Sequence, residues 1–196
     1  MGREVRFVAS FPCLPNHCQG EYRMAKTLST TFNLMVSALH SLVGDLRTAK
    51  DPPKVSLTAS LTDGTGANKA DLLHADRYTL AASKTELDLT GGVSDVYGDA
   101  VTYHGVKVLL VYNRSTDAGE YLVVGGGTNP IAGNLTDGSD SWKVQPGGVF
   151  LSYAPDPADN DDCMIVVDGT SDTLSLDTTD SGATLDADVI VVGISA

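Results

Sequence analysis

The 196-residue sequence has few cysteines, no long apolar run and few basic residues after residue 84. Its three cysteines are an odd and sparse set, which gives no disulfide framework and is typical of a reducing site of synthesis. No apolar run approaches the roughly 18–20 residues that a membrane-spanning helix needs. We therefore expect neither a disulfide-stabilised secreted fold nor a membrane protein.

The shortage of basic residues is confined to one part of the chain. Residues 1–84 hold 10 Lys/Arg and 7 Asp/Glu, whereas residues 85–196 hold 3 Lys/Arg against 18 Asp/Glu, a balance of −15. Phosphate backbones would repel this acidic part, so we predict that nucleic acid is not a partner. Almost all the acids are Asp, a residue that favours turns because its short side chain bonds to nearby backbone.

Catalytic signatures are also missing. The three histidines that lie within or beside expected strands, His40, His74 and His104, are far apart in sequence, and no Gly-x-Ser-x-Gly motif accompanies them. The glycine-rich stretch at Gly125–Gly127 lacks the Gly-Lys-Ser/Thr ending of a nucleotide loop, and Pro130 disfavours a following helix. We predict a protein that is not an enzyme and that needs no cofactor.

An acidic loop is a candidate metal site. Asp156, Asp159, Asp161 and Asp162 lie within seven residues, and clustered carboxylates on a loop can bind calcium. The spacing is not that of a twelve-residue EF-hand loop, and the glycine of its sharp turn is missing. We favour a solvated connector between two strands over a calcium site.

The first 23 residues differ from the rest. They contain two of the three cysteines, and the codons of Gln19–Glu21 can include a bacterial ribosome-binding sequence at the customary distance before Met24. Our hypothesis is that residues 1–23 are a translated leader or a disordered extension, outside the fold.

The segment after Phe32 fits two local structures. Its apolar residues occur at helical spacing and also in a period-two series, which short runs often do. Pro52-Pro53 then interrupts the pattern, and Val55 to Leu61 alternate apolar and polar residues before the Asp63-Gly64 turn. We favour an antiparallel pair of long strands over a helix followed by a strand.

The rest of the chain reads as short strands separated by Gly, Asn, Asp and Pro clusters such as Gly91-Gly92, which favours a sandwich or barrel over βαβ units. The stretches "VKVLLVY" and "DVIVVGIS" are apolar on both faces, as central strands are. The expected strands are Leu72–Leu80, Thr85–Leu89, Val106–Asn113, Glu120–Val124, Ser141–Val144, Val149–Ala154, Met164–Asp168, Thr173–Leu176 and Val189–Ile194.

The predicted fold is all-β, an antiparallel, jelly-roll-like β-sandwich with an N-terminal arm or hairpin. We assign residues 24–54 to the arm or first strand and residues 55–196 to the sandwich domain. Trp142, the only tryptophan, is expected to be a half-buried strand residue, although it could also stack on a sugar.

Five phrases of the sequence resemble, in this order, small β-rich structural proteins encoded in the virion modules of tailed bacteriophages, near capsid and tail genes. The resemblance covers roughly residues 24–196 and provides no catalytic residues. The phrases are "LTDGTGANKADLL" (Leu61–Leu73), "TLAASKTELDLTG" (Thr79–Gly91), "VYGDAVTYHGVKVLLV" (Val96–Val111), "PGGVFLSYAPD" (Pro146–Asp156) and "DADVIVVGISA" (Asp186–Ala196).

The resemblance implies a location in the virion, after synthesis in the bacterial cytoplasm, and a non-enzymatic role as a capsid decoration (cement) protein. Its partners would be the major capsid protein or other virion subunits, and a homotrimer is the favoured assembly. We predict that the N-terminal part docks on the shell or on a neighbouring copy through Arg47, Lys50 and Lys54. The alternatives are a tail or head-tail component with a glycan-binding surface, and a hydrolase that acts on a cell-surface polymer.

Overall fold

The computed structural model describes residues 26–38, 40–43, 48–51, 54–131, 139–155 and 163–196. Strands make up 59% of the structure, and no helix occurs within these ranges, so none of the described segments is a helix that could cross a membrane. Every ladder between its named strands is antiparallel. The prediction of an all-β chain with antiparallel sheets is therefore confirmed.

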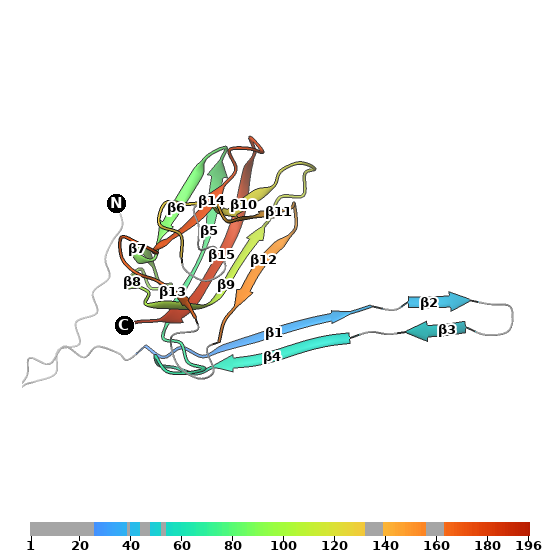
Figure 1. Ribbon diagram of the computed structural model, residues 1–196, viewed down its shortest axis with the longest axis horizontal. Coiled ribbons are helices and arrows are strands. Elements are labelled where there is room, and N and C mark those ends of the chain that lie inside the picture. The colour runs from blue at the N-terminus through green and yellow to red at the C-terminus, as the bar shows by residue number, and fades with distance from the viewer. Residues whose placement is uncertain (1–25, 39, 44–47, 52–53, 132–138, 156–162) are drawn as a thin grey trace, which may run out of the picture.

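Two sheets form the body of the protein (Figure 1). The first has the order β12-β9-β15-β5, with β13 also paired to β9, and its strands are β5 (Leu72–Ala81), β9 (Gly105–Asn113), β12 (Val149–Tyr153), β13 (Met164–Ile165) and β15 (Thr184–Ile194). The second has the order β11-β10-β14-β6, and its strands are β6 (Lys84–Asp88), β10 (Leu122–Gly125), β11 (Ser141–Val144) and β14 (Thr173–Asp177).

The strand pairs of the body are nested within one another along the chain. The first strand β5 pairs with the last strand β15, β6 pairs with β14, β9 pairs with β12, and β10 pairs with β11. The pairs β9–β15 and β10–β14 then complete the two sheets. The chain between β5 and β15 is thus one long antiparallel hairpin whose strand pairs alternate between the sheets.

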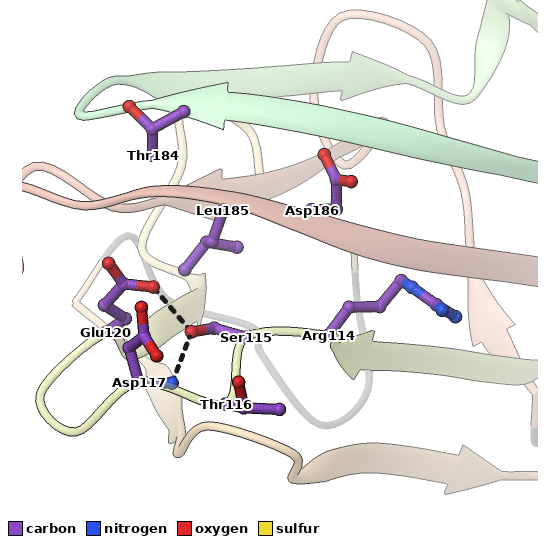
Figure 2. A pocket seen from close by; sticks show the side chains of 8 residues that line it. All are labelled: Arg114, Ser115, Thr116, Asp117, Glu120, Thr184, Leu185 and Asp186. Carbon is purple, nitrogen blue, oxygen red and sulfur yellow. Dashed lines mark hydrogen bonds between the residues drawn. The ribbon is translucent and has the colours of Figure 1, made fainter.

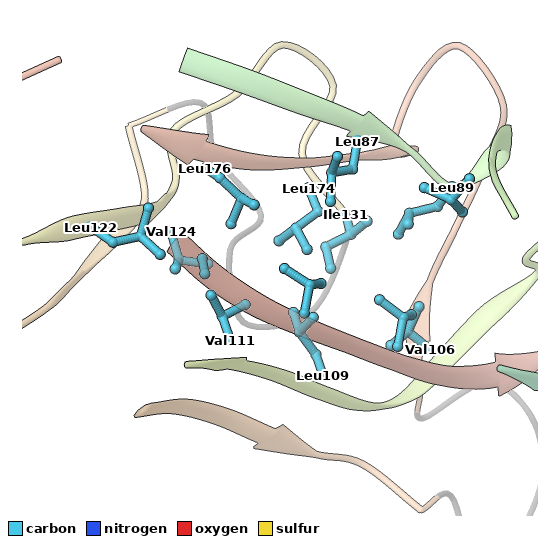
Figure 3. Close-up of a cluster of buried hydrophobic side chains, with 14 of the residues drawn as sticks. Leu87, Leu89, Val106, Leu109, Val111, Leu122, Val124, Ile131, Leu174 and Leu176 are labelled. Atoms are coloured by element: carbon cyan, nitrogen blue, oxygen red, sulfur yellow. The ribbon is translucent and has the colours of Figure 1, made fainter. Parts of the chain in front are cut away.

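One apolar core lies between the sheets. Because successive side chains of a strand point to opposite faces, Leu185, Ala187, Val189 and Val191 of β15 are buried while the residues between them are partly exposed. Figure 3 shows leucines and valines of β6, β10 and β14 facing those of β9. Burying each such side chain contributes about 1.5–3 kcal/mol, so this cluster is the main stabilising feature of the body.

The nine strands expected from residue 72 onward all overlap strands of the structure. The two stretches expected as central strands are β9 and β15, and each has neighbours on both sides in the first sheet. Their outer face is covered by a second apolar cluster, which contains Val108, Val192, Leu61 and Ala70. This double coverage explains why both strands are apolar on both faces.

Two strands that the sequence did not predict, β7 (Thr90–Ser94) and β8 (Ala100–Thr102), form a separate hairpin. The expectation of a turn at Gly91-Gly92 is wrong, because both glycines lie within β7. Gly91 has a φ of 128°, and the register shifts between Thr90 and Val93. The glycines therefore form a β-bulge, a feature for which glycine is equally suited.

The N-terminal segment forms a long arm, which we define as β1 (Thr30–Ser37) and β4 (Lys54–Leu61) together with β2 (His40–Val43) and β3 (Thr48–Asp51) further out. β1 pairs with β4 over eight residues, from Thr30 opposite Leu61 to Ser37 opposite Lys54. The arm projects beyond the body on the side of β12 (Figure 1). The preference for a strand pair over a helix in this region is confirmed.

Candidate docking arm and surface sites

The pairing of β1 with β4 separates the arm into one apolar and one polar face, because partners in a ladder share a face. The polar face consists of Thr31, Asn33, Met35, Ser37, Lys54, Ser56, Thr58 and Ser60, and Met35 is its one apolar side chain. We define the apolar face of the arm as the cross-strand pairs Phe32–Ala59, Leu34–Leu57 and Val36–Val55.

Exposure of the apolar face increases away from the body. Phe32 and Ala59 are half-buried, Leu34 and Leu57 are 39% and 41% exposed, and Val36 and Val55 are 59% and 66% exposed. Isolated exposed apolar side chains are ordinary, but these four form two adjacent pairs on one ribbon. The outer half of the β1–β4 ladder thus offers a contiguous apolar surface to a partner.

The base of the arm is fixed to the body by apolar contacts. The ring of Phe32 stacks on that of Tyr153 in β12, with 4.9 Å between centroids and 15° between planes. Leu61, at the end of β4, is buried in the second cluster against the outer face of the first sheet, together with Val108 and Val192. These contacts set the direction in which the arm leaves the body.

A polar clamp holds the chain just before the arm. The Lys26 ammonium contacts Asp95 Oδ2 at 2.6 Å, also pairs with Asp99, and lies 5.0 Å from the centroid of the Tyr97 ring. The hydrogen bond from Lys26 lowers the pKa of the Asp95 carboxyl, and the same bond is the main cause of a raised Lys26 pKa. No local sequence pattern indicates this clamp, because its partners are about 70 residues apart.

Two of the three cations predicted for docking lie in strands of the arm. Lys54 is the first residue of β4 and is exposed, and Lys50 lies in β3 opposite Ser41. Arg47 lies outside the described residues.

The predicted calcium candidates Asp156, Asp159, Asp161 and Asp162 all lie outside the described residues. Elsewhere in the described ranges, no group of three or more His, Cys, Asp or Glu side chains is arranged to hold a metal ion.

The buried histidine His74 takes part in structural hydrogen bonds. His74 is 3% exposed, its Nδ1 lies 2.6 Å from the Ser94 carbonyl oxygen, and its Nε2 lies 2.9 Å from the Tyr78 hydroxyl. A carbonyl only accepts, so Nδ1 donates to it, and Nε2 is engaged by the Tyr78 hydroxyl. Burial is the main cause of a raised Tyr78 pKa, with a further contribution from Asp76. This arrangement does not activate a serine.

A polar cleft of about 360 Å3 lies between the loop after β9 and the start of β15 (Figure 2). Ser115 Oγ donates to Glu120 at 2.5 Å and accepts from the Asp117 amide at 3.1 Å. These bonds stabilise the turn itself, as serine commonly does in loops. Neither histidine nor cysteine is among the residues that line this cleft.

Trp142 is more exposed than the expected half-buried strand residue. It lies in β11 with 59% of its surface exposed, and its ring is tilted against Phe150, 6.5 Å away between centroids. Both strands are at sheet edges, β11 in the second sheet and β12 in the first. An exposed aromatic ring that also contacts a second ring can form a stacking surface.

Comparisons of the chain with protein-family models, curated proteins and solved structures find no match.

Proposed function

We propose that this chain is a non-enzymatic structural protein of a bacteriophage virion, a decoration protein that binds and stabilises the head shell. The observation that carries the proposal is the arm, a hairpin that projects from the body and continues beyond the β1–β4 ladder as β2 and β3. A cement protein needs a rigid scaffold and an element that grips neighbouring subunits. The proposed partner is the major capsid protein or another virion subunit, and the proposed assembly is a homotrimer.

The proposal extends to the fold: the two sheets would form a jelly-roll sandwich. Its support is the nested pairing of eight strands, β5 with β15, β6 with β14, β9 with β12 and β10 with β11. Double-sheet jelly rolls recur in viral capsid proteins and in lectins. A fold of this kind suits a structural or binding role, although the function must be argued from the arm.

The charges and polar sites are consistent with this role. Apart from the arm, the chain from residue 62 to its end holds 6 Lys/Arg against 21 Asp/Glu, a balance of −15. Such a body would face solvent, away from packaged DNA. The proposal has no need of a catalytic group, a cofactor or a membrane.

The experiment is excision of the outer arm, which we define as residues 38–53, the segment that contains β2 and β3. Residues 38–53 are replaced by Asn-Gly, a two-residue turn that joins the register partners Ser37 and Lys54 and leaves the rest of the β1–β4 ladder in place. Phage heads that lack this protein are mixed with the purified variant and pelleted. We expect loss of attachment, because the excised segment includes Arg47 and Lys50.

Two controls accompany this test. Circular dichroism and thermal melting check that the body is still folded, and the conservative variant Lys54→Arg should attach like the unchanged protein. Attachment of the excised variant at full strength would refute the docking role of the outer arm. Absence of the native protein from purified virions would refute the function as a whole.

A second candidate function is favoured by Trp142. Its 59% exposure and its support by Phe150 would also suit a glycan-binding surface on a tail or head-tail protein. Glycan-array binding that Trp142→Ala abolishes, and that Val96→Ala at another exposed apolar position leaves intact, would support this alternative. The number of copies per particle also discriminates, since decoration requires hundreds and a tail component only a few.

A further inference from the structure

The outer apolar face of the arm has no cover within the part of one copy that the structure describes. Leu34 is directly opposite Leu57, and Val36 is directly opposite Val55, in two adjacent cross-strand pairs. A two-stranded ribbon is at best marginally stable in water unless its apolar face packs on something else. The inner end of the same face meets this need within the copy, where Phe32 stacks on Tyr153. The outer end has no such contact among the described residues.

Charge indicates which surface of that molecule fits. Residues 30–61, which span the arm, hold three cations, Arg47, Lys50 and Lys54, against two acids, a balance of +1, while Lys26 just before them is paired with acids of the body. The rest of the chain, residues 62–196, has a balance of −15. Contact between two arms would place like charges together, whereas contact between an arm and a body pairs opposite charges.

We propose that the partner of the apolar face is a second copy of this chain, with the arm of one copy packed on the acidic body of the next. The contact is head-to-tail, so each copy provides one arm and one receiving surface. Contacts of this type close into a ring when the rotation between copies permits it. The inference does not rest on a place in the virion, because it concerns the purified protein alone.

The test places a charge on each face of the arm in turn. Val36→Asp introduces a carboxylate on the apolar face, and Met35→Asp introduces the same group one residue away, on the polar face. The two positions are similarly exposed, at 59% and 65%, so the pair is matched for local effects. Sedimentation velocity over a concentration series measures self-association of the full chain without phage particles.

We expect the unchanged chain and Met35→Asp to form the same oligomer. Val36→Asp should weaken association by at least about 100-fold, because an unpaired carboxylate would be buried in the contact. A monomeric unchanged chain, or equal association of both variants, would overturn the proposal. Thermal melting of both variants checks that the body is intact, which the 59% exposure of Val36 leads us to expect.

A capture experiment distinguishes arm-to-body from arm-to-arm contact. Tagged Val36→Asp has a defective arm but an unaltered body. In the head-to-tail arrangement the arm of the unchanged chain binds this body, so the tagged variant still captures the unchanged chain. In an arm-to-arm arrangement it would retain nothing, and the proposed receiving surface would be wrong. Tagged and untagged Val36→Asp should not associate in either arrangement. Normal self-association combined with failure to attach to phage heads would refute only the virion role.

Discussion

Substitution of Gly193 by alanine should strongly destabilise the body. Gly193 lies in β15 opposite Val106 of β9, at a register shift that leaves Lys107 as the extra residue of a β-bulge. A Cβ atom at position 193 would press on the carbonyl oxygen of Gly105 and would lie 2.7 Å from Cδ1 of Tyr103. Tyr103 is 2% exposed, so its ring has little room to move.

The size of the effect depends on which of the clashing atoms can move. The first clash is with backbone, which no change of rotamer relieves, and the central strands β9 and β15 would have to separate at the bulge. Overpacking typically costs about 1–3 kcal/mol, and a backbone clash of this kind belongs at the upper end, about 3 kcal/mol. For a chain of this size that corresponds to a melting temperature lower by about 6–12 °C.

Thermal unfolding followed by circular dichroism measures the effect. Gly66→Ala is the matched control, because a Cβ atom there makes an ordinary contact, 3.7 Å from Cδ of Lys69. The control should melt within about 2 °C of the unchanged protein, as surface substitutions usually do. If the melting temperature of Gly193→Ala equals that of this control, β9 and β15 do not need glycine at the bulge. The steric reasoning would then be wrong.

Two further predictions concern the surface of the body and the base of the arm. Asp188 accepts from Arg77 and Arg114 at 2.7 and 2.8 Å, and these cations lower its pKa, so its stabilisation is present above the ordinary Asp range and is lost as pH falls through the lowered value. Asp188→Asn should therefore lower the melting temperature modestly at pH 7, and the difference should shrink as the pH falls below the ordinary Asp pKa of about 3.9; a difference that grows on acidification would contradict this reading. A double-mutant cycle on Phe32→Ala and Tyr153→Ala should give a coupling energy of about 0.5–1.5 kcal/mol, and independent effects of the two changes would mean that the stacked rings do not anchor the arm.

Most of the strands could be predicted from the sequence because their signal is local. Alternation of apolar and polar residues, bounded by turn residues, marks each strand of the body, and an unbroken apolar run marks β9 and β15 as central. The hairpin of β7 and β8 was missed because Gly91 and Gly92 have the same local appearance in a turn and in a bulge. Only the pairing of Val93 with Val101 distinguishes the two cases.

The candidate sites depended on contacts between distant residues. The period-two series in the arm indicated strands, but the register of β1 on β4 decides that Leu34 and Leu57 share a face while Met35 points away from it. The exposure of Trp142 follows from the position of β11 at a sheet edge, which its sequence does not state.

From the sequence alone it follows that this chain is β-rich, where most of its strands lie, and that its excess of acidic residues lies after residue 84. These properties depend on residue type and on short-range spacing. Only the tertiary structure decided which strands pair, which apolar residues the core covers and which it leaves on the arm. Burial is a property of the packed chain, so the amino-acid sequence does not distinguish a valine in the core from an exposed valine on the arm.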